Sequence, residues 1–159
     1  MKCSGTGAAY AFSRSGATWS QQAYLKAREQ DRGDSLGGAI AISADGNTVV
    51  AGAADEDSMT TGVDAVKSGD SGEVGAADDT SSGASYAFVR AGADWTEHAS
   101  FKASNTGAFD EFGSSIAVSG DGHTVAVGAR FEDSGATGVN GNEADNSVTD
   151  AGAVYAFGR

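Results

Sequence analysis

The sequence predicts an all-β protein assembled from repeated units of four short antiparallel strands. Three observations predict it: a repeat with a period of 76 residues, apolar runs with strand-like alternation, and a composition unsuited to helices. Val, Ile, Leu and Phe together supply only 24 of 159 residues, while glycine alone supplies another 24 and proline is absent. Two leucines cannot build the core of a helical bundle, which needs large aliphatic side chains at helical spacing.

The repeat runs through most of the chain. The segment 36–53 reads LGGAIAISADGNTVVAGA, and 76 positions later 112–129 reads FGSSIAVSGDGHTVAVGA. The hexapeptide GAAYAF at 7–12 returns as GASYAF at 83–88 and as GAVYAF at 152–157. The last interval is seven residues shorter than the first, and a length difference inside a repeat marks a surface loop.

Each unit is expected to hold four strands. The first two, 39–43 and 48–51, flank Asp45-Gly46, a pair that tolerates positive φ and favours a tight hairpin turn. The third is the Gly-Ala-x-Tyr-Ala-Phe strand, with its aromatic side chains on one face. A short connection at 13–18 then leads into a fourth strand that begins at Trp19. Units of four short strands are the blades of a β-propeller.

The strand order predicts three blades, of which only one is complete. Residues 1–35 would hold the third and fourth strands of a partial first blade, 36–103 a complete blade, and 104–159 a third blade that lacks its last strand. Propellers close with typically four to eight blades, so this chain stays open unless copies join or it is part of a longer chain. In a ring of copies, the strand that begins at Trp19 of one chain would serve as the missing fourth strand of its neighbour's third blade. The strand at 7–12, which occupies the third position of a blade, would then be left over at each junction.

The units resemble FG-GAP repeats. The resemblance rests on the Phe112-Gly113-Ser114-Ser115 start, the Val-Gly-Ala end at 127–129 and the Gly-Ala-x-Tyr-Ala-Phe strand. Such repeats build the propeller of integrin α-subunits and occur in many bacterial extracellular proteins, and the tryptophan strand and Asp-Gly hairpin are more similar to the bacterial type. The resemblance implies an extracellular or cell-surface location, although no signal peptide is visible behind Met1.

Calcium is the cofactor candidate. Integrin-type repeats often carry an Asp-rich calcium loop between their first two strands, but here that place holds a single carboxylate, Asp45 or Asp121. The loop between the second and third strands is acidic instead, and clustered oxygen ligands suit a hard cation. The candidate ligands in the last unit are Glu132, Asp133, Asn140, Asn142 and Asp145. The alternative is a solvated acidic loop without a metal.

Two short motifs are open to both a functional and a structural interpretation. Arg32-Gly33-Asp34 matches a tripeptide that some integrins recognise, but it also suits a loop that merely spaces two blades. Residues 33–37 fit the Gly-x-Ser-x-Gly nucleophile elbow, which requires a strand, a strained turn and a helix. A loop that leads into an antiparallel strand does not supply that context, so no catalytic residue is assigned. Trp19 and Trp95 are expected to pack between blades, and Cys3 to be a free thiol.

The net charge of −12 limits the classes of partner. It disfavours nucleic acid and anionic membrane surfaces, and no apolar run is long enough for membrane insertion. The sequence therefore favours a non-enzymatic repeat module that binds protein or glycan through its loops and supports adhesion. The alternatives are a self-assembling structural fragment without a ligand and an enzyme on a propeller scaffold.

Overall fold

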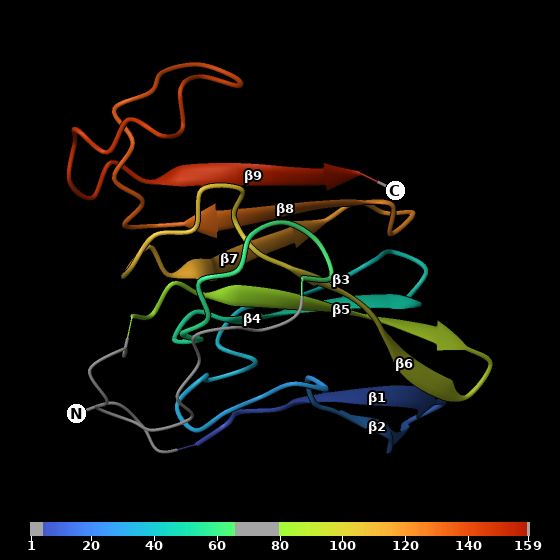
Figure 1. Ribbon diagram of the computed structural model, residues 1–159. Coiled ribbons are helices and arrows are strands. Elements are labelled where there is room, and N and C mark those ends of the chain that lie inside the picture. The colour runs from blue at the N-terminus through green and yellow to red at the C-terminus, as the bar shows by residue number, and fades with distance from the viewer. Residues whose placement is uncertain (1–4, 66–79, 159) are drawn as a thin grey trace.

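A computed structural model describes residues 5–65 and 80–158, and the region around Cys3 lies outside the described residues. Within the described residues the only regular structure is nine strands in three antiparallel sheets, with no helix and no sheet closed into a barrel (Figure 1). The predicted all-β class is therefore confirmed, and sheets of this size are consistent with partial propeller blades. The same residues contain no helix that is long and apolar enough to span a membrane.

The sheets form in chain order and contain two, four and three strands. The first pairs β1 with β2, the second has the order β3-β4-β5-β6, and the third has the order β7-β8-β9. The bounds are β1 Ala9–Ser15, β2 Thr18–Leu25, β3 Ile40–Ile42, β4 Thr48–Ala53, β5 Ala84–Ala91, β6 Asp94–Phe101, β7 Phe112–Val118, β8 Thr124–Ala129 and β9 Ala153–Gly158. Within each sheet, strands that follow one another along the chain are paired, as expected for antiparallel blades.

The Asp-Gly hairpin of the second sheet is confirmed, but its loop is longer than a two-residue turn. The Ser43 amide donates to the Thr48 carbonyl at 2.9 Å, which leaves a four-residue loop at 44–47. The Asp45 carboxylate closes this loop by accepting from Ser43 Oγ at 2.5 Å and from the Asn47 amide at 3.0 Å. These hydrogen bonds lower the pKa of Asp45. The aspartate thus acts as an internal cap rather than as a residue of a tight turn.

The hairpin between β7 and β8 repeats this design. Asp121 Oδ1 accepts from Ser119 Oγ at 2.5 Å and from the His123 amide at 3.0 Å. The hydrogen bond from Ser119, followed by those from His123, lowers the pKa of Asp121 to about 2. The His123 side chain lies at the exposed hairpin tip.

The expected connection at 13–18 is mostly strand. β1 continues to Ser15 and β2 begins at Thr18, so only Gly16 and Ala17 turn the chain. Gly16 has a φ of +60°, which a two-residue hairpin requires and glycine adopts without a Cβ penalty. The sequence-based estimate was too long because the polar run Ser13-Arg14-Ser15 continues the strand beyond Phe12.

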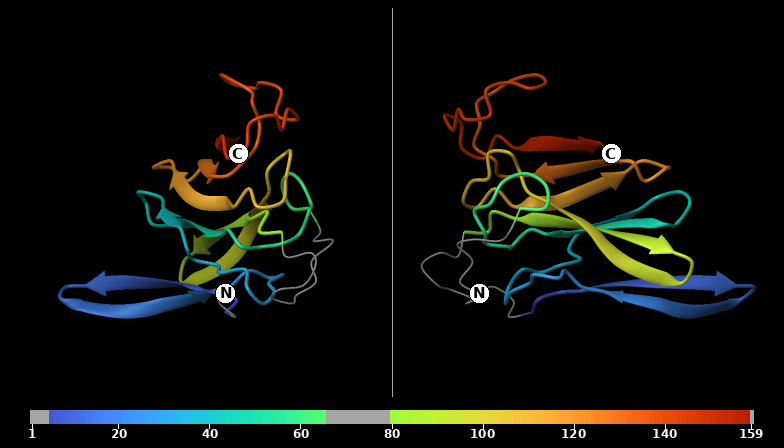
Figure 2. Two further views of the ribbon diagram at one scale, coloured as in Figure 1. Left: turned by 90° about the vertical axis from the view of Figure 1, so that its left-hand side faces the viewer. Right: turned by 45° about the vertical axis from the view of Figure 1, so that its right-hand side comes forward.

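Consecutive sheets are joined where the third-type strand of one meets the first strand of the next. Parallel bridges link Gly7 with Leu36 and Gly83 with Phe112. Gly83 has a φ of +84°, and a Cβ there would collide with the backbone of Phe112. This position therefore needs glycine for both its dihedral angle and its space. Figure 2 shows the resulting succession of sheets, with β1 and β2 at one end and β9 at the other.

Apolar side chains fill the two spaces between the sheets. Leu25, Leu36, Tyr86 and Phe88 belong to a cluster between the first and second sheets. A second cluster, between the second and third sheets, contains Phe101, Phe112, Val125 and Val127. Most of the large apolar side chains of the middle unit lie in these two clusters, so a chain with few such residues still forms a core.

Equivalent residues of the repeat differ in burial because the end sheets lack a neighbour. Tyr10 and Phe12 are each 54% exposed, whereas their counterparts Tyr86 and Phe88 are buried in the first cluster. Trp95 packs against the same cluster, but Trp19 is 65% exposed. The expectation of packing between sheets is therefore met by Trp95 and is wrong for Trp19, since none of the three described sheets covers that face.

Candidate functional site

A buried polar cluster lies at the end of the second sheet where the long loop leaves β4. Glu56, Asp57 and Ser58 open this loop, and all three side chains are buried. A hydrogen bond from the Glu56 amide to the Ala53 carbonyl, at 3.2 Å, turns the chain back over the sheet. Polar groups removed from water in this way need partners inside the protein.

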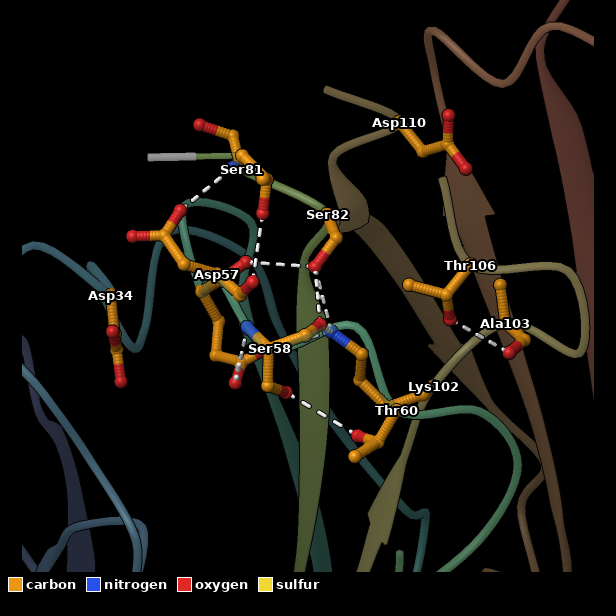
Figure 3. Close-up of polar contacts among 12 residues, drawn as sticks. Asp34, Asp57, Ser58, Thr60, Ser81, Ser82, Lys102, Ala103, Thr106 and Asp110 are labelled. Atoms are coloured by element: carbon orange, nitrogen blue, oxygen red, sulfur yellow. Dashed lines mark hydrogen bonds and ion pairs between the residues drawn. The ribbon is translucent and has the colours of Figure 1, made fainter. Parts of the chain in front are cut away.

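Lys102 supplies the charge that balances this cluster. It follows the last residue of β6, and its Nζ donates to Glu56 Oε2 at 2.6 Å, to the Ser58 carbonyl at 2.6 Å and to Ser82 Oγ at 2.9 Å (Figure 3). These contacts use all three ammonium hydrogens. The result is a fully buried ion pair that joins the loop after β4 to the end of β6.

The same cluster anchors the start of β5. The Gly83 amide donates to the Glu56 carbonyl at 2.8 Å, and Ser82 Oγ lies 2.7 Å from the Ser58 carbonyl. The Ser81 amide donates to Asp57 Oδ1 at 2.7 Å. The Glu-Asp-Ser segment thus fixes both ends of a long loop, and the Glu56 and Asp57 carboxylates stabilise the fold through these contacts.

The third sheet repeats the segment as Glu132-Asp133-Ser134 but lacks the lysine. The Gly152 amide donates to the Glu132 carbonyl at 2.8 Å and the Asp150 amide to Asp133 Oδ1 at 2.9 Å, as in the second sheet. The Glu132 side chain is only 2% exposed, and Oε1 accepts from Asn105 Nδ2 at 2.7 Å. Among the described residues Glu132 makes no ion pair, because the strand that carries the lysine in the second sheet has no counterpart beside β9.

Burial and the neighbouring carboxylates raise the pKa values of two groups near Glu132, Asp110 and Tyr155. Burial raises the pKa of Asp110, against the Gly107 amide that donates to it at 2.8 Å, and the charges of Glu132 and Asp133 raise it further. Burial, together with the nearby carboxylates, also raises the pKa of Tyr155. Both directions indicate a site where added positive charge would be favourable.

The five calcium candidates lie in the loop between β8 and β9. Glu132 and Asp133 are engaged as described, Asn140 is exposed, and Asn142 accepts through its carbonyl from the Ser134 hydroxyl at 3.2 Å. The Asp145 amide donates to the same carbonyl at 3.1 Å. In the parts of the chain that the structure describes, no three His, Cys, Asp or Glu side chains are placed to hold a metal ion. Calcium binding stays a prediction.

The Arg32-Gly33-Asp34 tripeptide places its aspartate inside the protein. Asp34 is 2% exposed, and Oδ2 accepts from the Asp31 amide at 2.8 Å. Asp110, which lies 76 residues later, makes the same hydrogen bond with the Gly107 amide. The recurrence therefore has a structural reason in the loop between blades. The adhesion hypothesis for this tripeptide stays a prediction.

The sequence interpretation missed the ion pair between Glu56 and Lys102. A signal was present, because both positions belong to the 76-residue repeat: Glu56 recurs as Glu132, and Lys102 is the recurrence of Lys26. Charged residues that recur among otherwise variable loop positions are expected to have a structural partner.

Comparison with known proteins finds a family model that matches part of the chain. No curated protein matches the chain. A family model described as FG-GAP repeat matches residues 95–157, which extend from β6 to β9 and include Lys102, Glu132 and Tyr155. The matched segment thus contains the fourth strand of one sheet and all three strands of the next. Residues 95–157 therefore match the FG-GAP repeat, as the resemblance in the sequence predicted.

Proposed function

We propose that the chain is a non-enzymatic module of an extracellular or cell-surface protein and binds protein or glycan through the loops at one end of its sheets. FG-GAP repeats are generally non-catalytic and usually occur in extracellular proteins, which supports this proposal. The segment 33–37, which fits the nucleophile elbow in sequence, leads into β3 and not into a helix. An enzymatic function consequently has no support from that motif.

A polar pocket at the loop end of the sheets carries the proposal. Its volume is about 360 Å³, and it lies between the segment that follows β2 and the second sheet. Charged and polar side chains from that segment, from β6 and from the loop after β4 line it, among them Arg28, Glu29, Asp64, Glu97 and His98. The Arg28 amide donates to Glu97 Oε2 at 2.6 Å and holds the two walls together. Ligand sites are concave and combine a shaped wall with a few convergent polar groups.

The proposal is tested by screening the chain against an array of glycans and against purified cell-surface proteins. We expect binding that is weakened by Arg28→Ala and by His98→Ala. His123→Ala is the matched control, because this second histidine lies at a hairpin tip outside the pocket lining. Binding that is unchanged in both pocket variants, or lost equally in the control, would contradict a site in this pocket.

A self-assembling structural fragment is the second candidate. The observation in its favour is the exposed aromatic face of the first sheet, where Tyr10, Phe12, Trp19 and Tyr24 are all more than half exposed. Exposed apolar patches of this kind mark interaction surfaces. Association between copies in the absence of any array ligand would support this candidate over the first.

A further inference from the structure

The two end sheets contain complementary parts of the complete middle sheet. The first sheet has only a third-type and a fourth-type strand, and Lys26 follows the latter as Lys102 follows β6. The third sheet has the first three strands and Glu132, the counterpart of Glu56. The middle sheet shows what the two parts form when they meet, namely a four-stranded sheet with a buried ion pair.

Lys26 has no carboxylate partner among the described residues. Its Nζ donates to the Gly7 carbonyl at 2.5 Å and to the hydroxyl of Thr6, and both acceptors are neutral. The side chain is half-buried. A partly desolvated ammonium with neutral acceptors gains more from a carboxylate than a freely solvated one would.

A groove lies beside β9 where the middle sheet has its fourth strand beside β5. Its volume is about 840 Å³, and it is lined by Glu132, Ser134, the residues of β9 and the loop around 136–143. Lys102 borders this groove, but its ammonium is bound to Glu56. Among the described strands β9 pairs with β8 alone, and none of them occupies its other edge.

We propose that the open edge of β9 binds strand β2 of a second copy of this chain, which places Lys26 of that copy against Glu132. The join repeats the contact seen between β5 and β6. By that pattern Leu25 would lie opposite Val154 and Tyr24 opposite Tyr155, as Phe101 lies opposite Ser85 and Ser100 opposite Tyr86. Charge complementarity selects the occupant, since within residues 5–65 and 80–158 Glu132 has no cation beside it and Lys26 has no carboxylate.

In the proposed contact, β2 exchanges one pairing partner for an equivalent one. It leaves β1 of its own chain and pairs with β9 of the other copy. Because β1 and β9 both carry the Gly-Ala-x-Tyr-Ala-Phe sequence, one hydrogen-bond ladder replaces another of the same kind. Exchange of an identical element between copies is a low-cost route to association. The gain is the ion pair, and β1 is the strand left over. The contact is head-to-tail, because each copy offers Lys26 at one end and Glu132 at the other.

Paired charge reversals test the proposal by sedimentation velocity over a micromolar concentration series. We expect the wild-type chain to associate, and Lys26→Glu and Glu132→Lys each to lose association by about tenfold or more in affinity, which is 1.4 kcal/mol or more. An equimolar mixture of the two variants should associate again, because each variant then meets an opposite charge at both ends. Arg32→Glu is the matched control, since it makes the same charge change at an exposed site.

Circular dichroism establishes that each variant is folded before its association is measured. If Glu132→Lys does not fold, Glu132→Gln replaces it, and the contact is then identified by zero-length carbodiimide coupling in a mixture of ¹⁵N-labelled and unlabelled wild-type chains. A Lys26–Glu132 peptide that joins labelled to unlabelled material is the expected product. A monomeric wild-type chain, association unchanged in the variants, or associated chains that lack this peptide would each overturn the proposal. The assay contains no ligand, so its outcome is independent of the loop-binding function.

Discussion

Replacement of Glu56 by glutamine isolates the energetic role of the buried ion pair. Glutamine keeps the shape of the side chain and its oxygen can still accept from the Ser58 amide, which donates at 3.2 Å. The Lys102 ammonium, which lies 2.6 Å from Glu56 Oε2, would then lose the charge of this carboxylate while it stays buried. Removal of one partner of a buried pair costs about 3–5 kcal/mol because an uncompensated charge is left in the interior.

The magnitude is expected at the lower end of that range, near 3 kcal/mol, because Lys102 keeps its hydrogen bonds to the Ser58 carbonyl and Ser82 Oγ. For a chain of this size the melting temperature should fall by about 6–12 °C. Urea unfolding followed by circular dichroism gives the free energy of unfolding directly. The double variant Glu56→Gln/Lys102→Met should recover part of the loss, since it removes both charges.

Glu111→Gln is the matched control. Glu111 Oε2 also lies 2.6 Å from a cation, Arg130 Nη2, but the arginine side chain is 60% exposed. A solvent-exposed pair is worth about 0–1 kcal/mol. If Glu56→Gln and Glu111→Gln have equal effects, or if the double variant is no more stable than Glu56→Gln, then burial does not determine the energy of the pair and the reasoning fails.

Three further predictions concern the backbone, pH and salt. Gly83→Ala should destabilise the protein by several times more than Gly92→Ala in urea unfolding, because both glycines have positive φ but only the former faces a neighbouring sheet's backbone. Asp121→Asn should lower the melting temperature at neutral pH. The difference from the wild-type chain should vanish as the pH falls through the folded-state pKa of about 2, since a carboxylate with a lowered pKa stabilises the fold only while it is ionised. A difference in melting temperature that stays constant with pH would contradict this prediction. Sodium chloride should raise the melting temperature by screening the net charge of −12, and a calcium site would appear as an additional rise at matched ionic strength that a chelator reverses and Asp133→Asn/Asp145→Asn abolishes.

The strands and their order could be predicted from the sequence alone. The 76-residue repeat, the Asp-Gly pairs and the alternation of Tyr and Phe specify local conformation and neighbour pairing, and these depend on residues close in the chain. All nine strands therefore appear in the expected order. The boundaries were less accurate at the turn around Gly16, where polar strand residues resemble a loop.

Tertiary structure decided which members of each repeated pair are buried and what they contact. Tyr10 and Tyr86 occupy the same place in the repeat, yet only the latter is covered, because burial depends on a neighbouring sheet that the local sequence does not encode. The sequence left Asp34 open to an adhesive and a structural interpretation, and in the fold its side chain is buried and bound to the Asp31 amide of its own loop. Glu56 and Lys102 are 46 residues apart, and only the folding of β4 and β6 into one sheet brings their charges together. Desolvation and pairing are properties of that assembled environment, so they follow from packing and not from composition.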